Sequence, residues 1–219
     1  MKYWVFLVFL ISSASSNFDL ENCDNCEENI LLNTGYLISQ TPTINPNSKA
    51  KIHFQNSYLT INGFKNNIFY PKINFSAQIS KNLMLSSKVF SFQFEDETPQ
   101  ILGAGVQYYF GANDDTLNNL FIVQRTDIKG LEHFFLSSIN IELKKWVELK
   151  NFHLRYGVGS MFIKTSIFRI SNDIQRKKGQ LNYFEIDCLY KNYFLDLGFG
   201  LKLSNQIISL SINLCKEIF

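Results

Sequence analysis

Apolar and polar residues alternate with a period of two along the chain from about residue 72 onward. The clearest stretch is 193–203, where the odd positions are aromatic or aliphatic and the even positions include Asp196, Gly198, Gly200 and Lys202. The stretch 206–216 repeats this pattern. Alternation of this kind predicts β-strands with one apolar and one polar face.

About ten segments have the length of a membrane-crossing strand, roughly 9–11 residues. They are 51–61, 72–80, 84–94, 100–110, 117–127, 133–143, 152–162, 181–191, 193–203 and 206–216. Short polar connections with turn-forming residues separate them. The first segment alternates poorly, so eight strands without the first hairpin is the alternative.

An even number of strands places both chain ends on the same side of a barrel. If that side is the periplasm, the predicted inner turns are 81–82, 111–116, 144–151 and 192. The predicted outer connections are 62–71, 95–99, 128–132, 163–180 and 204–205. The longest of these, 163–180, predicts a hairpin that extends beyond the membrane.

Alternation alone fits a soluble barrel with an apolar interior as well as a membrane barrel with an apolar exterior. Aromatic residues favour the membrane barrel, because they fall at opposite strand ends, as in the belts of such barrels. Near the predicted inner ends are Tyr108, Phe110, Trp146 and Tyr190, and near the outer ends are Phe92, Phe94, Phe135 and Phe184. The opposite face carries Gly-x-Gly at 103–105, 157–159 and 198–200, which suits a narrow interior.

The N-terminus has the organisation of a cleavable export signal. Lys2 precedes an apolar run, 4–11, which is followed by the small residues 12–16. The run is too short to span a bilayer as a helix, which needs about 20 residues. We predict a signal peptide at 1–16 cleaved before Asn17, a periplasmic tail at 17–50 with a Cys-x-x-Cys motif, and an outer-membrane β-barrel at 51–219.

The export signal, the strand pattern and the final Phe219 together resemble small bacterial outer-membrane β-barrel proteins, without pointing to a specific family. In those proteins the last strand usually ends in an aromatic residue that the barrel-insertion machinery reads. Here Ile212 and Leu214 are out of phase with Phe219, which predicts either a bulge at 215–217 or an ending by chance. The resemblance implies the outer membrane of a Gram-negative cell envelope, with outer-membrane lipid, the insertion machinery and an envelope protein as partners.

The predicted fold is therefore all-β, an antiparallel up-and-down transmembrane β-barrel of about ten strands. The formal net charge is only +2, which gives no reason to expect a nucleic-acid partner. Cys23 and Cys26 predict a local disulfide in an oxidising compartment, with half a metal site or a redox pair as alternatives. Cys188 and Cys215 fall on opposite faces of their strands and are not expected to pair.

Four charged residues fall on the inward face of consecutive predicted strands near the periplasmic end. They are Glu142, Arg155, Asp187 and Asp196. We predict a luminal charge layer in which Arg155 pairs with Glu142 and Asp187 and closes a narrow barrel. Outside the barrel, Arg176, Lys177 and Lys178 form a basic loop, which either meets lipopolysaccharide phosphates or is simply solvated.

The function predicted from these features is a structural or interaction barrel that docks lipid or a partner through its outer loops. A narrow porin-like channel is the alternative, and a lipid-modifying enzyme or a soluble exported barrel is less favoured. His133, with Ser137 and Ser138 nearby, is at an outer strand end, and His153 is at the periplasmic end. No nucleophile motif accompanies them, so we expect no enzymatic activity, no metal and no cofactor.

Overall fold

The computed structural model describes residues 35, 41, 50–61, 68–91, 98, 100–111, 117–130, 134–168, 174–192, 196–204 and 207–217. This part of the chain contains ten β-strands. They are β1 (Ala50–Ile61), β2 (Ile68–Ser80), β3 (Leu83–Ser91), β4 (Gln100–Phe110), β5 (Asn119–Lys129), β6 (Phe134–Leu149), β7 (Phe152–Phe168), β8 (Ile174–Tyr190), β9 (Asp196–Ser204) and β10 (Ile207–Glu217).

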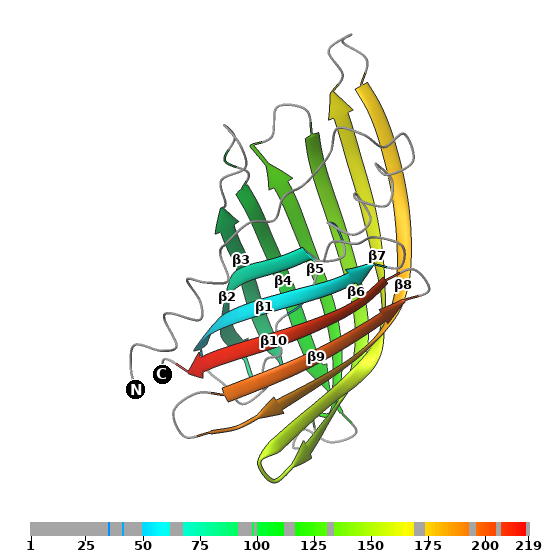
Figure 1. Ribbon diagram of the computed structural model, residues 1–219. Helices are drawn as coiled ribbons and strands as arrows, with labels where there is room; N and C mark the ends of the chain where they lie inside the picture. Colours follow the sequence, from blue (N-terminus) through cyan, green and yellow to red (C-terminus); the bar gives the residue numbers. More distant parts are fainter. Residues whose placement is uncertain are drawn as a thin grey trace.

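The ten strands form a closed barrel in which every strand pairs antiparallel with its neighbours in sequence. The last strand closes the barrel by pairing with the first, from Lys51↔Glu217 to Ile61↔Ile207. In Figure 1, β3 to β7 stand upright at the back, while β1, β9 and β10 cross the front at a large angle to them, because strands on opposite walls of a barrel tilt in opposite directions in one view. The predicted all-β, up-and-down barrel is confirmed, with ten strands instead of the alternative eight.

Pairing of the last strand is regular to its end. Lys51, Ile52 and His53 of β1 lie opposite Glu217, Lys216 and Cys215 without a shift in register. The bulge proposed for 215–217 is therefore not present. The terminal residue, Phe219, lies outside the described residues.

Four strands are several residues longer than the alternation predicted. β6 continues to Leu149, so the predicted turn 144–151 shrinks to Lys150 and Asn151, where Lys150 has a φ of 40°. β7 and β8 stay paired up to Phe168↔Ile174, which confirms the extended hairpin and places most of 163–180 in regular strands. β2 begins at Ile68 instead of 72. At the ends of β6, β7 and β8, polar residues on both faces hide the period, although the hydrogen-bond ladder continues.

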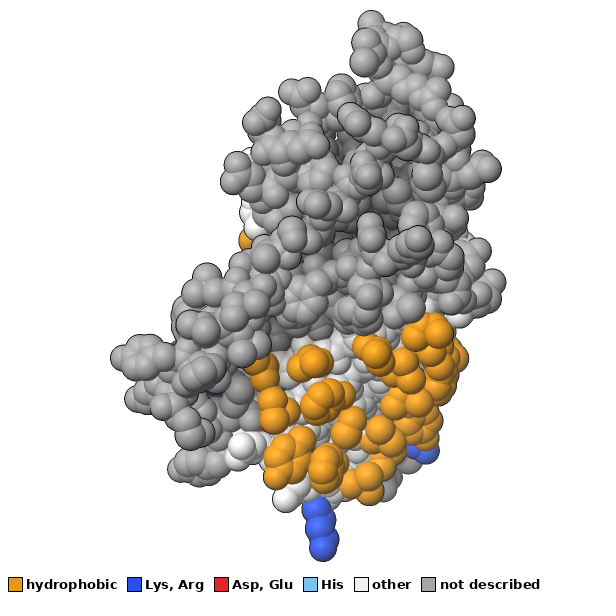
Figure 2. All heavy atoms as spheres, in the orientation of Figure 1, with side chains coloured by type: hydrophobic (Ala, Val, Ile, Leu, Met, Phe, Trp, Pro, Cys, Tyr) orange, Lys and Arg blue, Asp and Glu red, His pale blue; other side chains and the backbone are white. Residues whose placement is uncertain are grey.

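The two faces of the barrel wall have the reverse of a soluble protein's polarity. Outward-facing side chains such as Val158, Phe199 and Ile212 are 57%, 56% and 53% exposed, whereas the inward-facing Gln107 and Arg155 are fully buried. Figure 2 shows the apolar side chains as a nearly continuous field on the lower half of the visible face. Monomeric soluble proteins rarely expose an apolar patch this large. The exterior is therefore suited to hydrocarbon, and the polar side chains are enclosed.

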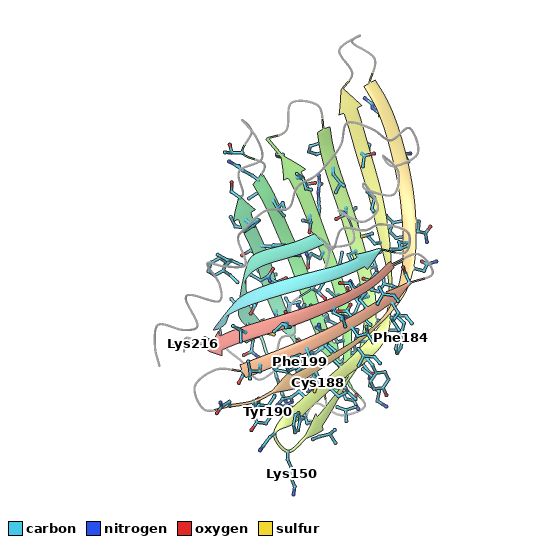
Figure 3. The ribbon with its side chains drawn as sticks, viewed as in Figure 1. Lys150, Phe184, Cys188, Tyr190, Phe199 and Lys216 are labelled. Carbon is cyan, nitrogen blue, oxygen red and sulfur yellow. The ribbon has the colours of Figure 1, made fainter. Side chains whose placement is uncertain are left out.

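Aromatic side chains lie on the outer wall near the lower strand ends. Tyr108 and Phe110 stack at 6.1 Å, and Phe152 and Tyr190 lie 5.0 Å apart between ring centroids. Figure 3 shows Tyr190 low on β8, above Lys150 at the tip of the β6–β7 turn. The prediction for Trp146 was wrong, because this residue lies on β6 with its side chain turned inward and 3% exposed.

At the upper end of β6, Phe135 is partly buried. Phe184 was predicted near an outer end, but β8 begins at Ile174 and Phe184 lies in its lower half, 40% exposed. Phe92 and Phe94 lie outside the described residues.

Candidate functional site: a charged network in the lumen

Six charged side chains meet inside the barrel. They are Glu142 and Lys144 on β6, Arg155 on β7, Glu185 and Asp187 on β8, and Lys202 on β9. All six are nearly inaccessible to solvent. Within the network three carboxylates face three cations, since an isolated buried ion is very unfavourable. A further buried cation, Lys88 of β3, also faces the lumen.

Lys144 lies at the centre of this network. Its Nζ lies 2.7 Å from Glu142, 2.9 Å from Glu185 and 3.6 Å from Asp187. Arg155 binds Asp187 through two nitrogens, with Nη2 at 2.6 Å and Nε at 2.8 Å from Oδ2. Each carboxylate thus faces at least one cation at close range.

Glu142 is the carboxylate with the most described donors. Asn140 donates to it at 2.6 Å, the Tyr183 hydroxyl at 2.7 Å and the Thr41 hydroxyl at 2.9 Å, in addition to Lys144. These donors come from β6, from β8 and from the segment that precedes the barrel. Glu142 therefore ties together parts of the chain that are distant in sequence.

Lys202 completes the network from β9. Its Nζ lies 3.4 Å from Glu185 and 3.7 Å from Glu142, and 3.9 Å from the centroid of the Tyr183 ring. An ammonium group over an aromatic face gains a favourable cation–π interaction. The network therefore spans four neighbouring strands, β6 to β9.

Two glycines on β7 provide the space that the network occupies. Gly157 lies between Lys144 and Glu185 in the register, so the lysine reaches across β7 to the carboxylate. Gly159 lies beside Tyr183, and a Cβ there would be 2.6 Å from the tyrosine oxygen. The Gly-x-Gly pattern therefore has a specific cause, because a side chain at either position would block the contacts between the side chains of β6 and those of β8.

Apolar side chains line the lumen on both sides of the charges. On β8 the two carboxylates lie between Leu181 and Leu189, which are 2% and 0% exposed. At the lower end, a buried cluster of Met84, Tyr109, Leu120 and Ile122 packs against the inner wall. The charges are thus enclosed within the barrel and do not line a wet surface.

The segment before β1 also contributes to the lumen. Thr41 is 2% exposed, donates to Glu142, and accepts a hydrogen bond from Lys144 at 3.4 Å. Gly35 lies against the inward-facing Ile163, since a Cβ on Gly35 would be 2.5 Å from its Cδ1. The predicted boundaries of the N-terminal tail, 17–50, stay a prediction, and these contacts place two of its residues beside the inner wall.

Replacement of Thr41 by valine tests this contact. The variant Thr41→Val keeps the shape and removes a donor to Glu142 and an acceptor for Lys144, so we expect the free energy of unfolding to fall by about 1–3 kcal/mol. Urea unfolding of the refolded barrel in detergent micelles measures this change. The control Thr98→Val, at an exposed threonine, should change it by less than about 0.5 kcal/mol. If Thr41→Val matches wild type, Thr41 does not stabilise the network.

Three of the four residues predicted for the charge layer lie in this network. The structure places Arg155 against Asp187, as the sequence suggested, and Glu142 against Lys144. Asp196 is half-buried at the start of β9, opposite Cys215 of β10.

Sequence reasoning missed Lys144, Glu185 and Lys202. Lys144 was assigned to a turn because the predicted strand stopped at residue 143, whereas β6 continues to Leu149. Glu185 and Lys202 share the inward phase of Asp187 and Gly200, and the register places them directly opposite each other. Their phase could have been recognised from the sequence, but their common height depends on strand stagger.

The remaining predicted site residues lie elsewhere or outside the described part. Cys23, Cys26 and His133 are not among the described residues. Cys188 of β8 is half-buried, and Cys215 of β10 is buried on the inward face. His153 is buried at the lower end of β7, 3.6 Å from Glu148 and 5.2 Å from the Trp146 ring.

The predicted basic loop is in fact part of a strand, because Arg176, Lys177 and Lys178 continue the ladder of β8 opposite β7. In the described part of the chain, no helix has the length and apolar character needed to cross a membrane.

The barrel's fold class, with a polar enclosed lumen and an apolar exterior, is that of a transmembrane β-barrel. No protein-family model matches the chain, and no curated protein matches it. Similar solved structures include Neisserial surface protein A (12% identity, 77% of this chain and 96% of that one, TM-score 0.38). Two more are Ail of Yersinia pestis in complex with the heparin analogue sucrose octasulfate (12%, 77% and 94%, 0.35) and the N-terminal β-barrel domain of Pseudomonas aeruginosa OprF (10%, 77% and 99%, 0.32).

These structures are of the kind that the sequence resembles, and no single family stands out among them. At these identities and TM-scores the likeness is remote. The function proposed below therefore rests on the chain's own residues.

Proposed function

We propose that this chain is an integral outer-membrane β-barrel with a closed lumen, and that its role is structural or interactive. In this proposal the protein is exported by a signal peptide, inserted by the barrel-insertion machinery, and docks lipid or an envelope partner through the outer ends of its strands. It has no catalytic centre and no cofactor.

The apolar exterior supports a position within a bilayer. A span that exposes Phe199, Val158 and Ile212 to water would lose the benefit of burying them, about 25 cal/mol for each Å² of apolar surface. A bilayer also tolerates only helices and closed barrels, because each backbone group must find a partner within the protein. The pairing of β10 with β1 meets this condition, since it leaves no strand edge open.

The network around Lys144 is the observation that carries the proposal of a closed lumen. A conducting pore needs a continuous column of water, whereas here the charges are paired with one another and enclosed. Barrels of this size have an interior that side chains are able to fill. The alternative function, a narrow porin-like channel, would require these ion pairs to separate.

Recording of ionic current separates the two functions. We expect the purified full chain, refolded and inserted into a planar lipid bilayer, to give no steady conductance above the bare membrane, because the ion pairs and the flanking apolar side chains leave no water path. A heat-dependent shift in gel mobility should show in parallel that the barrel is folded. Steady single-channel steps from folded protein would overturn the closed lumen and support the channel.

A further inference from the structure

The outward face of β8 changes chemistry in a regular order from its lower end to its outer end. Its lower part is apolar and includes Phe184, which lies directly opposite Val158 of β7, and the two residues are 40% and 57% exposed. Next along β8 are Asn182 and Gln180, and the Gln180 amide lies 3.4 Å from the Ser160 hydroxyl and 3.3 Å from the Asn182 oxygen. Along β8, apolar and then amide side chains therefore follow one another toward the outer end, whereas on β7 the apolar Phe162 lies opposite Gln180.

Three exposed cations follow at the outer end of the same face. Lys164 on β7 and Arg176 and Lys178 on β8 form what we call the basic strip. Figure 1 shows that β7 and β8 rise above the neighbouring strands, so the strip projects beyond the apolar field. At about 3.3 Å per residue and a tilt of about 40°, Lys178 stands about 15 Å above Phe184.

In the absence of a ligand, the arrangement of the basic strip lowers the stability of the folded barrel. Lys164 lies directly opposite Lys178 in the register, and like charges in such a cross-strand pair repel each other. Among the described outward-facing residues of β7 and β8, none is acidic. A bound anion with more than one negative charge would reverse the repulsion.

We infer that the basic strip binds the phosphate groups of a phosphorylated glycolipid in the outer leaflet. The strip faces sideways along the same surface as Phe184, so it meets molecules that lie beside the barrel in the membrane plane. Along β8, the order of apolar, amide and cationic side chains matches the order of acyl chains, sugar linkages and phosphates in such a lipid. Arginine adds a bidentate donor geometry that suits phosphate. This inference rests on the proposed function, because it needs the barrel to be in the outer membrane.

Binding of lipid A to the refolded full chain in neutral detergent micelles tests the inference. The variant carries Lys164→Gln, Arg176→Gln and Lys178→Gln together, and a charge-matched control carries Lys129→Gln, Lys150→Gln and Lys191→Gln, three exposed lysines elsewhere. Native mass spectrometry measures the binding of bisphosphorylated lipid A and of its dephosphorylated form. With about 1 kcal/mol for each basic residue near an anionic headgroup, we expect the strip variant to bind bisphosphorylated lipid A about a hundredfold more weakly than wild type.

The possible outcomes distinguish a failure of the inferred lipid binding from a failure of the proposed function. The control should bind bisphosphorylated lipid A like wild type, and wild type should bind the dephosphorylated form weakly. If wild type bound both lipids equally, or if the strip variant bound bisphosphorylated lipid A like wild type, the inferred phosphate binding by the basic strip would be wrong. Preference for soluble heparin over bisphosphorylated lipid A would also overturn it, in favour of an external polyanion. A heat-dependent gel shift shows that each variant is folded, and recovery of the wild type outside the outer membrane in cell fractionation would overturn the proposed function itself.

Discussion

The variant Arg155→Ala is expected to lower the free energy of unfolding by about 3–5 kcal/mol, the usual cost of removing one partner from a buried ion pair. Arg155 is fully buried and holds Asp187 through two nitrogens, so its loss leaves a carboxylate without its closest described cation. Urea unfolding in micelles measures the change. The same variant should also admit cations in a planar bilayer, because three carboxylates would then face Lys144 and Lys202.

Arg125→Ala is the matched control for Arg155→Ala. Arg125 also pairs with an aspartate, Asp127, at 3.1 Å, but its side chain is 63% exposed. Exposed ion pairs contribute about 0–1 kcal/mol, so the control should unfold almost like wild type. If Arg155→Ala were as stable as Arg125→Ala, the network would not be essential to the stability of the barrel. The channel function would then be better supported than the closed lumen.

Phe199→Arg is expected to lower the free energy of unfolding by about 2–4 kcal/mol, the cost of an arginine that faces lipid near the midplane. Phe199 lies midway along β9, beside Cys188 of β8, and is 56% exposed. Figure 3 shows it on the outer surface of the barrel, among Phe184, Cys188 and Tyr190. Urea unfolding of the barrel in phospholipid vesicles measures the change.

Depth within the membrane provides the control for Phe199→Arg. Gln180 also faces outward, but it lies near the outer end of β8 among polar side chains. Gln180→Arg should therefore change the free energy of unfolding by less than about 1 kcal/mol. Equal effects of the two variants, or a fully stable Phe199→Arg barrel, would mean that the exposed face does not contact lipid.

Much of the architecture could be predicted because a period of two is a local property of the chain. Each strand carries its own alternation, as in 193–203, and the facing of Arg155, Asp187 and Glu142 follows from it. What alternation cannot supply is the choice between an apolar interior and an apolar exterior. That choice becomes clear only when the strands are assembled and residues such as Phe199 are seen to be exposed.

The composition of the lumen was harder to predict, because heights in a tilted barrel depend on register. Glu185 and Lys202 face inward by their phase, but only the pairing of β8 with β9 shows that they are directly opposite. The contact of Thr41 with Glu142 joins residues 101 positions apart and has no local pattern at all.

Gly157 and Gly159 have a further consequence for how the barrel assembles correctly. A strand that slips by two residues keeps its apolar side outward, so hydrophobicity does not distinguish the slipped barrel from the native one. A two-residue slip of β7 in one direction would bring Arg155 to the place of Gly157, between Lys144 and Glu185, and close the passage between them. A register shifted by an even number of residues therefore loses the ion pairs that form across Gly157 and Gly159. The contacts of the interior, and not the apolar exterior, thus favour the native register during assembly.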